Sequence, residues 1–230
     1  MSDLIDATPS RRTFMAGIVA SSILTLPACS SLGGFSMIDA VQRILFLSSD
    51  RAFARMLSGD GFWDQQVATL GLGSFLGTRG DILSRILTSA LFKDRLQDAF
   101  GDIAYEGAER AAPIVTDAVR VIGIDNAIDL VRGGPTAATS FLRGSMGTRL
   151  IDAMVPELGT AMRVASDPLV GQLLGTLTGV EVGSVANRVA GNIDDTIWRE
   201  IGVEEAAIRA DPASTRDPLI IGVFGAGARL

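Results

Sequence analysis

Apolar residues recur every three or four positions along most of the chain beyond residue 35. Between residues 96 and 111 the pattern is clearest, because acidic and amide side chains occupy positions in between. This spacing is typical of helices that bury one face, whereas strands alternate every second residue. It predicts an all-α fold, a single bundle-like helical domain of about seven to nine helices. The four most regular stripes are Ile38, Val41, Leu45, Ala52 and Met56; Leu96, Ala99, Phe100, Ile103, Ala104, Ala108 and Ala111; Leu150, Ile151, Met154, Leu158 and Ala161; and Val189, Ile193, Ile197, Ile201 and Ile208.

Glycine, proline and aspartate mark where these helices begin and end. A glycine-rich loop is expected over about residues 58–80, and Pro156 predicts a kink in its helix. The short apolar runs at 119–124 and 219–224 fit either a helix or a strand. Further breaks are predicted at 133–135 and 211–212. Four aspartates precede apolar runs, as helix N-caps do: Asp81, Asp94, Asp125 and Asp167.

The first 29 residues have the organisation of a bacterial export signal. Arg11 and Arg12 precede Phe14, and an uncharged run of 14 residues, 15–28, ends just before Cys29. At ~1.5 Å per residue this run is too short for a ~30 Å hydrocarbon core, but it suits the apolar region of a signal peptide.

Two resemblances refine this prediction. Residues 10–15, S-R-R-T-F-M, resemble the twin-arginine export motif, and residues 26–29, L-P-A-C, resemble a lipobox, in which the cysteine carries the lipid. We expect residues 1–28 to be a cleaved signal and residues 29–35 a lipidated linker, with Cys29 bearing acyl groups such as palmitate. Ser30 after the cysteine favours the periplasmic face of the outer membrane. Alternatively, the two arginines are the basic region of an ordinary secretory signal. The signal and processing residues are Arg11, Arg12, Phe14, Leu26 and Ala28.

Several segments of the mature chain, in order, resemble a bacterial family known as domain of unknown function 4197. The most specific is R-G-G-P-T-A-A-T-S-F at residues 132–141, and others lie at 59–62, 108–113 and 204–212. The resemblance covers about residues 36–225 and implies a mostly helical, secreted and often lipidated protein, with residues 226–230 as a tail. It implies no activity and no catalytic residue. Arginines stand where the family tends to have lysines, and residues 195–198 replace a D-G-L-F-like stretch.

Composition excludes several classes of function. The chain has no histidine and one cysteine, which excludes an internal disulfide and a Cys/His zinc site. Its net charge of −6 argues against nucleic-acid binding, which needs a basic face. Apolar residues make up 47%, too many for a disordered chain. We expect no cofactor and no metal.

A glycine-glycine-proline turn is one candidate site. It precedes a predicted helix, whose free N–H groups attract anions. The residues that would form an anion or ligand site there are Arg132, Gly133, Gly134, Thr136, Thr139 and Arg143. The alternative is a helix end followed by a helix start, with no ligand.

Asp194 and Asp195 are candidate carboxylates, since paired carboxylates can act as acid and base. However, Asp195 lies four residues before Arg199, and Glu205 four before Arg209. Such pairs also suit a solvated helix face. The aromatic residues Phe62, Trp63 and Phe75 are expected to pack in the core rather than hold a ligand.

These observations predict a non-enzymatic lipoprotein of the cell envelope, attached to the membrane by its N-terminal lipid. Its helical domain would bind an envelope protein or an apolar, lipid-like ligand. Two alternatives stay open: a periplasmic enzyme that uses carboxylates and arginines, and a structural spacer.

Overall fold

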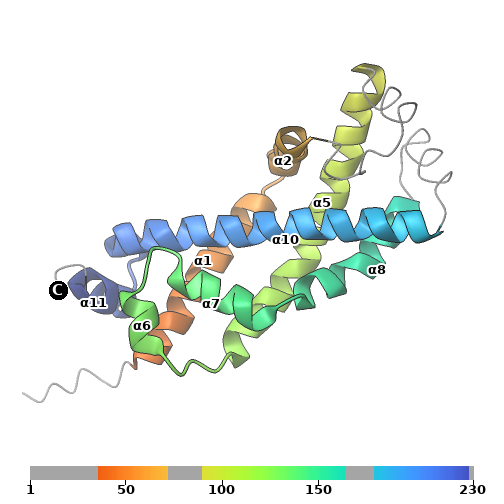
Figure 1. The fold of residues 1–230 in the computed structure, drawn as a ribbon. Coiled ribbons are helices and arrows are strands. Elements are labelled where there is room, and N and C mark those ends of the chain that lie inside the picture. The colour runs from red at the N-terminus through yellow and green to blue at the C-terminus, as the bar shows by residue number, and fades with distance from the viewer. Residues whose placement is uncertain (1–35, 72–89, 164–178, 228–230) are drawn as a thin grey trace, which may run out of the picture. The chain divides into compact units, whose positions relative to one another are not determined.

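The regular structure is helical throughout the residues that the computed structural model describes, namely 36–71, 90–163 and 179–227 (Figure 1). The all-α prediction and the single helical domain are confirmed. None of the helices in these ranges is both long and apolar enough to cross a bilayer. Along the described chain the elements are α1 (Met37–Met56), α2 (Phe62–Leu70), α5 (Ala90–Val121), α6 (Ala127–Arg132), α7 (Ala137–Met146), α8 (Arg149–Arg163), α10 (Gly179–Ala210), the 3₁₀ turn η1 (Pro212–Thr215) and α11 (Pro218–Gly227).

The core lies between α1, α5, α8 and α10. Helix α10 packs along α1 and α8, while α5 packs on α1, α2 and α8. The predicted stripes supply this core; Ile38, at 42% exposed, is the member that lies on the surface. Gly107 lets α5 approach its neighbours closely, because a Cβ there would lie 2.9 Å from Ile193 Cδ1 and 3.4 Å from Leu158 Cδ2.

The predicted loop over 58–80 is wrong in part, and the two runs that fitted either a helix or a strand contain helix. Residues 62–70 form α2 rather than loop, and residues 119–121 and 219–224 are helical. Both runs continue helices whose buried residues lie four positions apart. These are Val115 and Val119 in α5, and Ile220 and Phe224 in α11. Pro156 lies inside α8, and the helix continues on both sides of it.

Two of the four predicted aspartate caps are wrong. Asp94 lies inside α5, and Asn126 rather than Asp125 precedes α6. Asp81 and Asp167 lie outside the described residues. A true capping box begins α1, where the N–H of Asp39 donates to Ser36 Oγ at 3.0 Å and the N–H of Ser36 donates to Asp39 Oδ2 at 3.1 Å.

Candidate functional site

Helix α7 begins just after the predicted glycine-glycine-proline turn, and a carboxylate binds its first N–H groups. The carboxylate belongs to Glu205 of α10. Its two oxygens accept hydrogen bonds from the N–H groups of Ala138 at 3.0 Å and Thr139 at 2.7 Å. Glu205 is 0% exposed. Because a helix N-terminus stabilises negative charge, the anion expected at this turn is supplied from within the protein.

Arg209 balances this carboxylate and holds the preceding helix. Its Nε donates to Glu205 Oε1 at 2.7 Å, while Nη1 and Nη2 donate to the carbonyl oxygens of Val131 at 2.9 Å and Leu130 at 2.8 Å. These carbonyls belong to the last turn of α6, where helical partners run out. The guanidinium carbon also lies 4.8 Å from the centroid of the Phe224 ring in α11. The two charged residues therefore join four helices.

The prediction that Glu205 and Arg209 lie on a solvated face is wrong. Glu205 stands four residues after Ile201 and three before Ile208, so it occupies a position of the buried apolar stripe. This spacing was the feature of the sequence that could have shown that the Glu205 carboxylate faces inward. Its partners lie 66 and 67 residues away in sequence, which no local pattern indicates.

The structure brings together residues that the sequence presented as two separate sites. Arg143 of α7 donates from Nη2 to Asp194 Oδ2 at 2.9 Å and also bonds to Asp195. The Trp198 indole N–H donates to Asp194 Oδ1 at 2.8 Å. The expected pairing of Asp195 with Arg199 is replaced by this contact with Arg143.

Burial and ion pairing shift the pKa values of Asp194 and Arg143 in this cluster. Burial raises the pKa of Asp194 above its ordinary value, although the Trp198 hydrogen bond and the Arg143 charge oppose that shift. Partial burial alone would lower the pKa of Arg143, but Asp195 and Asp194 outweigh it and raise the pKa. Arg143 therefore stays charged, and both Asp194 oxygens already accept hydrogen bonds.

The other residues of the predicted turn form the connection between α6 and α7. Arg132 and Gly134 are exposed, and Thr136 precedes α7 without a capping hydrogen bond from its side chain. At Gly133 a Cβ would lie 2.6 Å from the Ala137 Cβ. Glycine is therefore needed at Gly133 for the chain to turn this tightly from α6 into α7.

A groove of about 380 Å³ lies between α7 and α10. Its floor includes Trp198 and Gly202, which are both buried. Gly202 lets Thr136, the residue before α7, approach α10 closely, because a Cβ at Gly202 would lie 3.2 Å from Thr136 Cγ2. The remaining lining includes Thr139, Ser140, Arg143, Asp195, Arg199, Val203 and Ala206.

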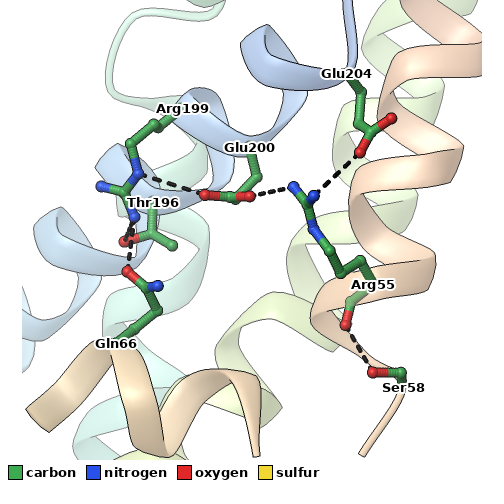
Figure 2. A network of polar contacts seen from close by, with 7 residues as sticks. All are labelled: Arg55, Ser58, Gln66, Thr196, Arg199, Glu200 and Glu204. Atoms are coloured by element: carbon green, nitrogen blue, oxygen red, sulfur yellow. Dashed lines mark hydrogen bonds and ion pairs between the residues drawn. The ribbon is translucent and has the colours of Figure 1, made fainter. Parts of the chain in front are cut away.

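A polar network crosses from this part of α10 to α1 and α2 (Figure 2). Arg199 donates to Gln66 Oε1 at 2.8 Å and contacts Glu200 at 3.4 Å. Glu200 also pairs with Arg55, which lies 3.2 Å from Glu204. Arg199, which lines the groove, is therefore held by partners from two helices.

Among the described residues, no group of three or more carboxylates, cysteines or histidines is placed to hold a metal ion. Trp63 is 4% exposed and packs edge-to-face on Phe62, with ring centroids 5.2 Å apart, as expected of core aromatics. Phe75 and the signal residues Arg11, Arg12, Phe14, Leu26, Ala28 and Cys29 lie outside the described residues.

Comparison with known proteins identifies the family of this chain. A family model described as protein of unknown function (DUF4197) matches residues 31–225. The chain belongs to this family. It covers α7, α10 and the groove between them, so the site is part of the family domain. No curated protein and no solved structure matches the chain.

Proposed function

We propose that this DUF4197 protein is a non-enzymatic lipoprotein of the cell envelope that binds a protein partner. Residues 1–28 would direct export by the twin-arginine route, and Cys29 would carry the lipid at the periplasmic face of the outer membrane. The support is the order of arginine pair, short apolar run and cysteine.

The groove between α7 and α10 carries the binding proposal. Its volume, about 380 Å³, is near the lower limit of ligand pockets, roughly 300–1,000 Å³. This suits an apolar side chain or two better than a whole lipid. The charged side chains that line it, Arg143, Asp195 and Arg199, would lose their remaining contact with water beside an acyl chain. A peptide offers them main-chain hydrogen bonds, so we propose an apolar segment of an envelope protein as the occupant.

A pair of neighbouring alanines provides a matched test. Ala206 lines the groove, whereas Ala207 is exposed on the same helix and is absent from the lining. A photo-crosslinking amino acid at Val203, on the groove, should capture a discrete partner in intact cells. Ala206→Leu should abolish the adduct, and Ala207→Leu should preserve it. Equal adducts in both variants would contradict the groove as the binding site.

The alternatives predict other results. A reproducible small-molecule mass on the purified native protein would favour an apolar ligand. A loss of phenotype in Asp194→Asn or Asp195→Asn at unchanged stability would favour an enzyme. A deletion that weakens the envelope, with neither a ligand nor a partner found, would favour a spacer.

The anchor is tested separately. Cys29→Ser should remove the acyl mass and release a folded domain from the membrane fraction. Arg11→Lys together with Arg12→Lys keeps the positive charge, so export should stop if the twin-arginine route is used and continue if the signal is an ordinary secretory one.

A further inference from the structure

The exposed apolar side chains of the described residues are unevenly distributed. Seven large ones are at least 37% exposed, and five of them belong to one end of the helical domain. We call these five the proximal face: Met37, Ile38, Val121, Ile128 and Ile221, which are 45%, 42%, 79%, 55% and 40% exposed.

The helices that carry the proximal face meet one another. Val119 and Arg120 of α5, Asp39 and Gln42 of α1, and Leu219 of α11 line one shallow depression. The first turn of α1, the last turn of α5 and the start of α11 are therefore neighbours. Helix α6, which carries Ile128, packs on both α1 and α11 (Figure 1).

The proximal face continues the core rather than interrupting it. Met37 and Ile38 lie three or four residues before Val41, which is 0% exposed, and so they extend the buried stripe of α1 beyond the core. One cation beside them is already paired, since Arg43 contacts Asp217 at 2.6 Å. An apolar interface, rather than an electrostatic one, fits such a surface.

The chain itself indicates what covers this face. Helix α1 begins one residue after Ser36, and Cys29 lies seven residues before Ser36. Seven residues reach at most about 25 Å when fully extended. If Cys29 carries lipid, as proposed above, the proximal face is therefore held close to the bilayer, where even weak apolar contact is favoured by the high local concentration.

We propose that the proximal face rests on the lipid surface to which Cys29 anchors the protein, with its apolar side chains at the headgroup boundary. This inference rests on the proposed lipidation. It fixes an orientation in which the other end of α1 points away from the membrane and the groove stays accessible to a partner.

Two valines make a matched test. Val121 belongs to the proximal face, whereas Val203 is 49% exposed beside Glu204, which contacts Arg55 near the far end of α1. Arg55 lies 18 residues beyond Met37, roughly 27 Å along the helix at ~1.5 Å per residue. Lipidation occupies the thiol of Cys29, so Val121→Cys and Val203→Cys each add one free thiol for an environment-sensitive fluorophore.

The full lipidated protein is reconstituted in vesicles of phosphatidylethanolamine and phosphatidylglycerol, with and without a quencher-labelled lipid. We expect a loss of fluorescence at position 121 and none at position 203. Vesicle-bound protein with no loss at either position, or equal loss at both, would overturn the orientation while leaving the anchor intact. Protein that fails to float with vesicles and carries no acyl mass would instead overturn the lipidation, and the inference with it.

Discussion

Replacing Glu205 by glutamine should lower the stability of the protein more than any substitution of an exposed residue. The Glu205 carboxylate lies where α6, α7 and α10 meet. The carboxylate accepts the N–H groups of Ala138 and Thr139 and pairs with Arg209, whose side chain is 11% exposed. In Glu205→Gln the amide NH₂ must face one of these donors. The variant therefore loses an acceptor and leaves the Arg209 charge without its counter-ion.

The magnitude follows from burial. Removing one partner of a buried ion pair costs about 3–5 kcal/mol, because the other charge stays out of water. For a domain of this size each kcal/mol lowers the melting temperature by roughly 2–4 °C. Glu205→Gln should thus lower it by about 6–20 °C, as measured by circular dichroism or calorimetry.

The adjacent residue is the control. Glu204 pairs with Arg55, whose side chain is 43% exposed, so Glu204→Gln should cost less than about 1 kcal/mol. The double variant Glu205→Gln with Arg209→Gln should lose less stability than the sum of its two single variants. If Glu205→Gln is no more destabilising than Glu204→Gln, the argument for the buried carboxylate is refuted.

Three further predictions concern titration and packing. Burial alone would raise the pKa of Asp217, but hydrogen bonds from Arg43 and from the N–H groups of Ile220 and Leu219 outweigh it and lower the pKa below 3.8. The folded carboxyl therefore binds fewer protons than the unfolded one, so the stability that it contributes is lost as pH falls below 3.8. When unfolding by urea is measured across this pH range, Asp217→Asn should no longer show that loss. The pKa of Asp194 is shifted in the opposite direction, upward, so the folded state binds more protons than the unfolded state above pH 3.8. The contribution of Asp194 to stability therefore falls as pH rises through the folded pKa. Asp194→Asn should abolish that fall. Gly107→Ala should cost about 1–3 kcal/mol by crowding Ile193 and Leu158, whereas Gly191→Ala, where a Cβ meets nothing within 4 Å, should gain about 0.5–1 kcal/mol; equal melting temperatures would contradict the packing argument.

Local pattern was sufficient for the helical class of the fold and for most of the core. Apolar spacing reports which face of a helix is buried, and the stripes that contain Phe100, Met154 and Ile197 are buried as predicted. The turn around Gly133 was also predictable, because glycine and proline break helices locally. Helix ends were less so: Asp94 has the chemistry of a cap, but α5 begins before it.

The sequence by itself determined the helical stripes and the turn before α7, since these depend on neighbours a few residues apart. Tertiary structure decided which charges meet. Arg143 reaches Asp194 across 51 residues, and Glu205 fills the N-terminus of α7 across 67. Local spacing can place Glu205 on the buried face of α10, but it cannot supply the donors that make burial of a carboxylate tolerable. Those donors come from helices brought together by apolar packing, so an anion site that looked open in the sequence is closed by the fold.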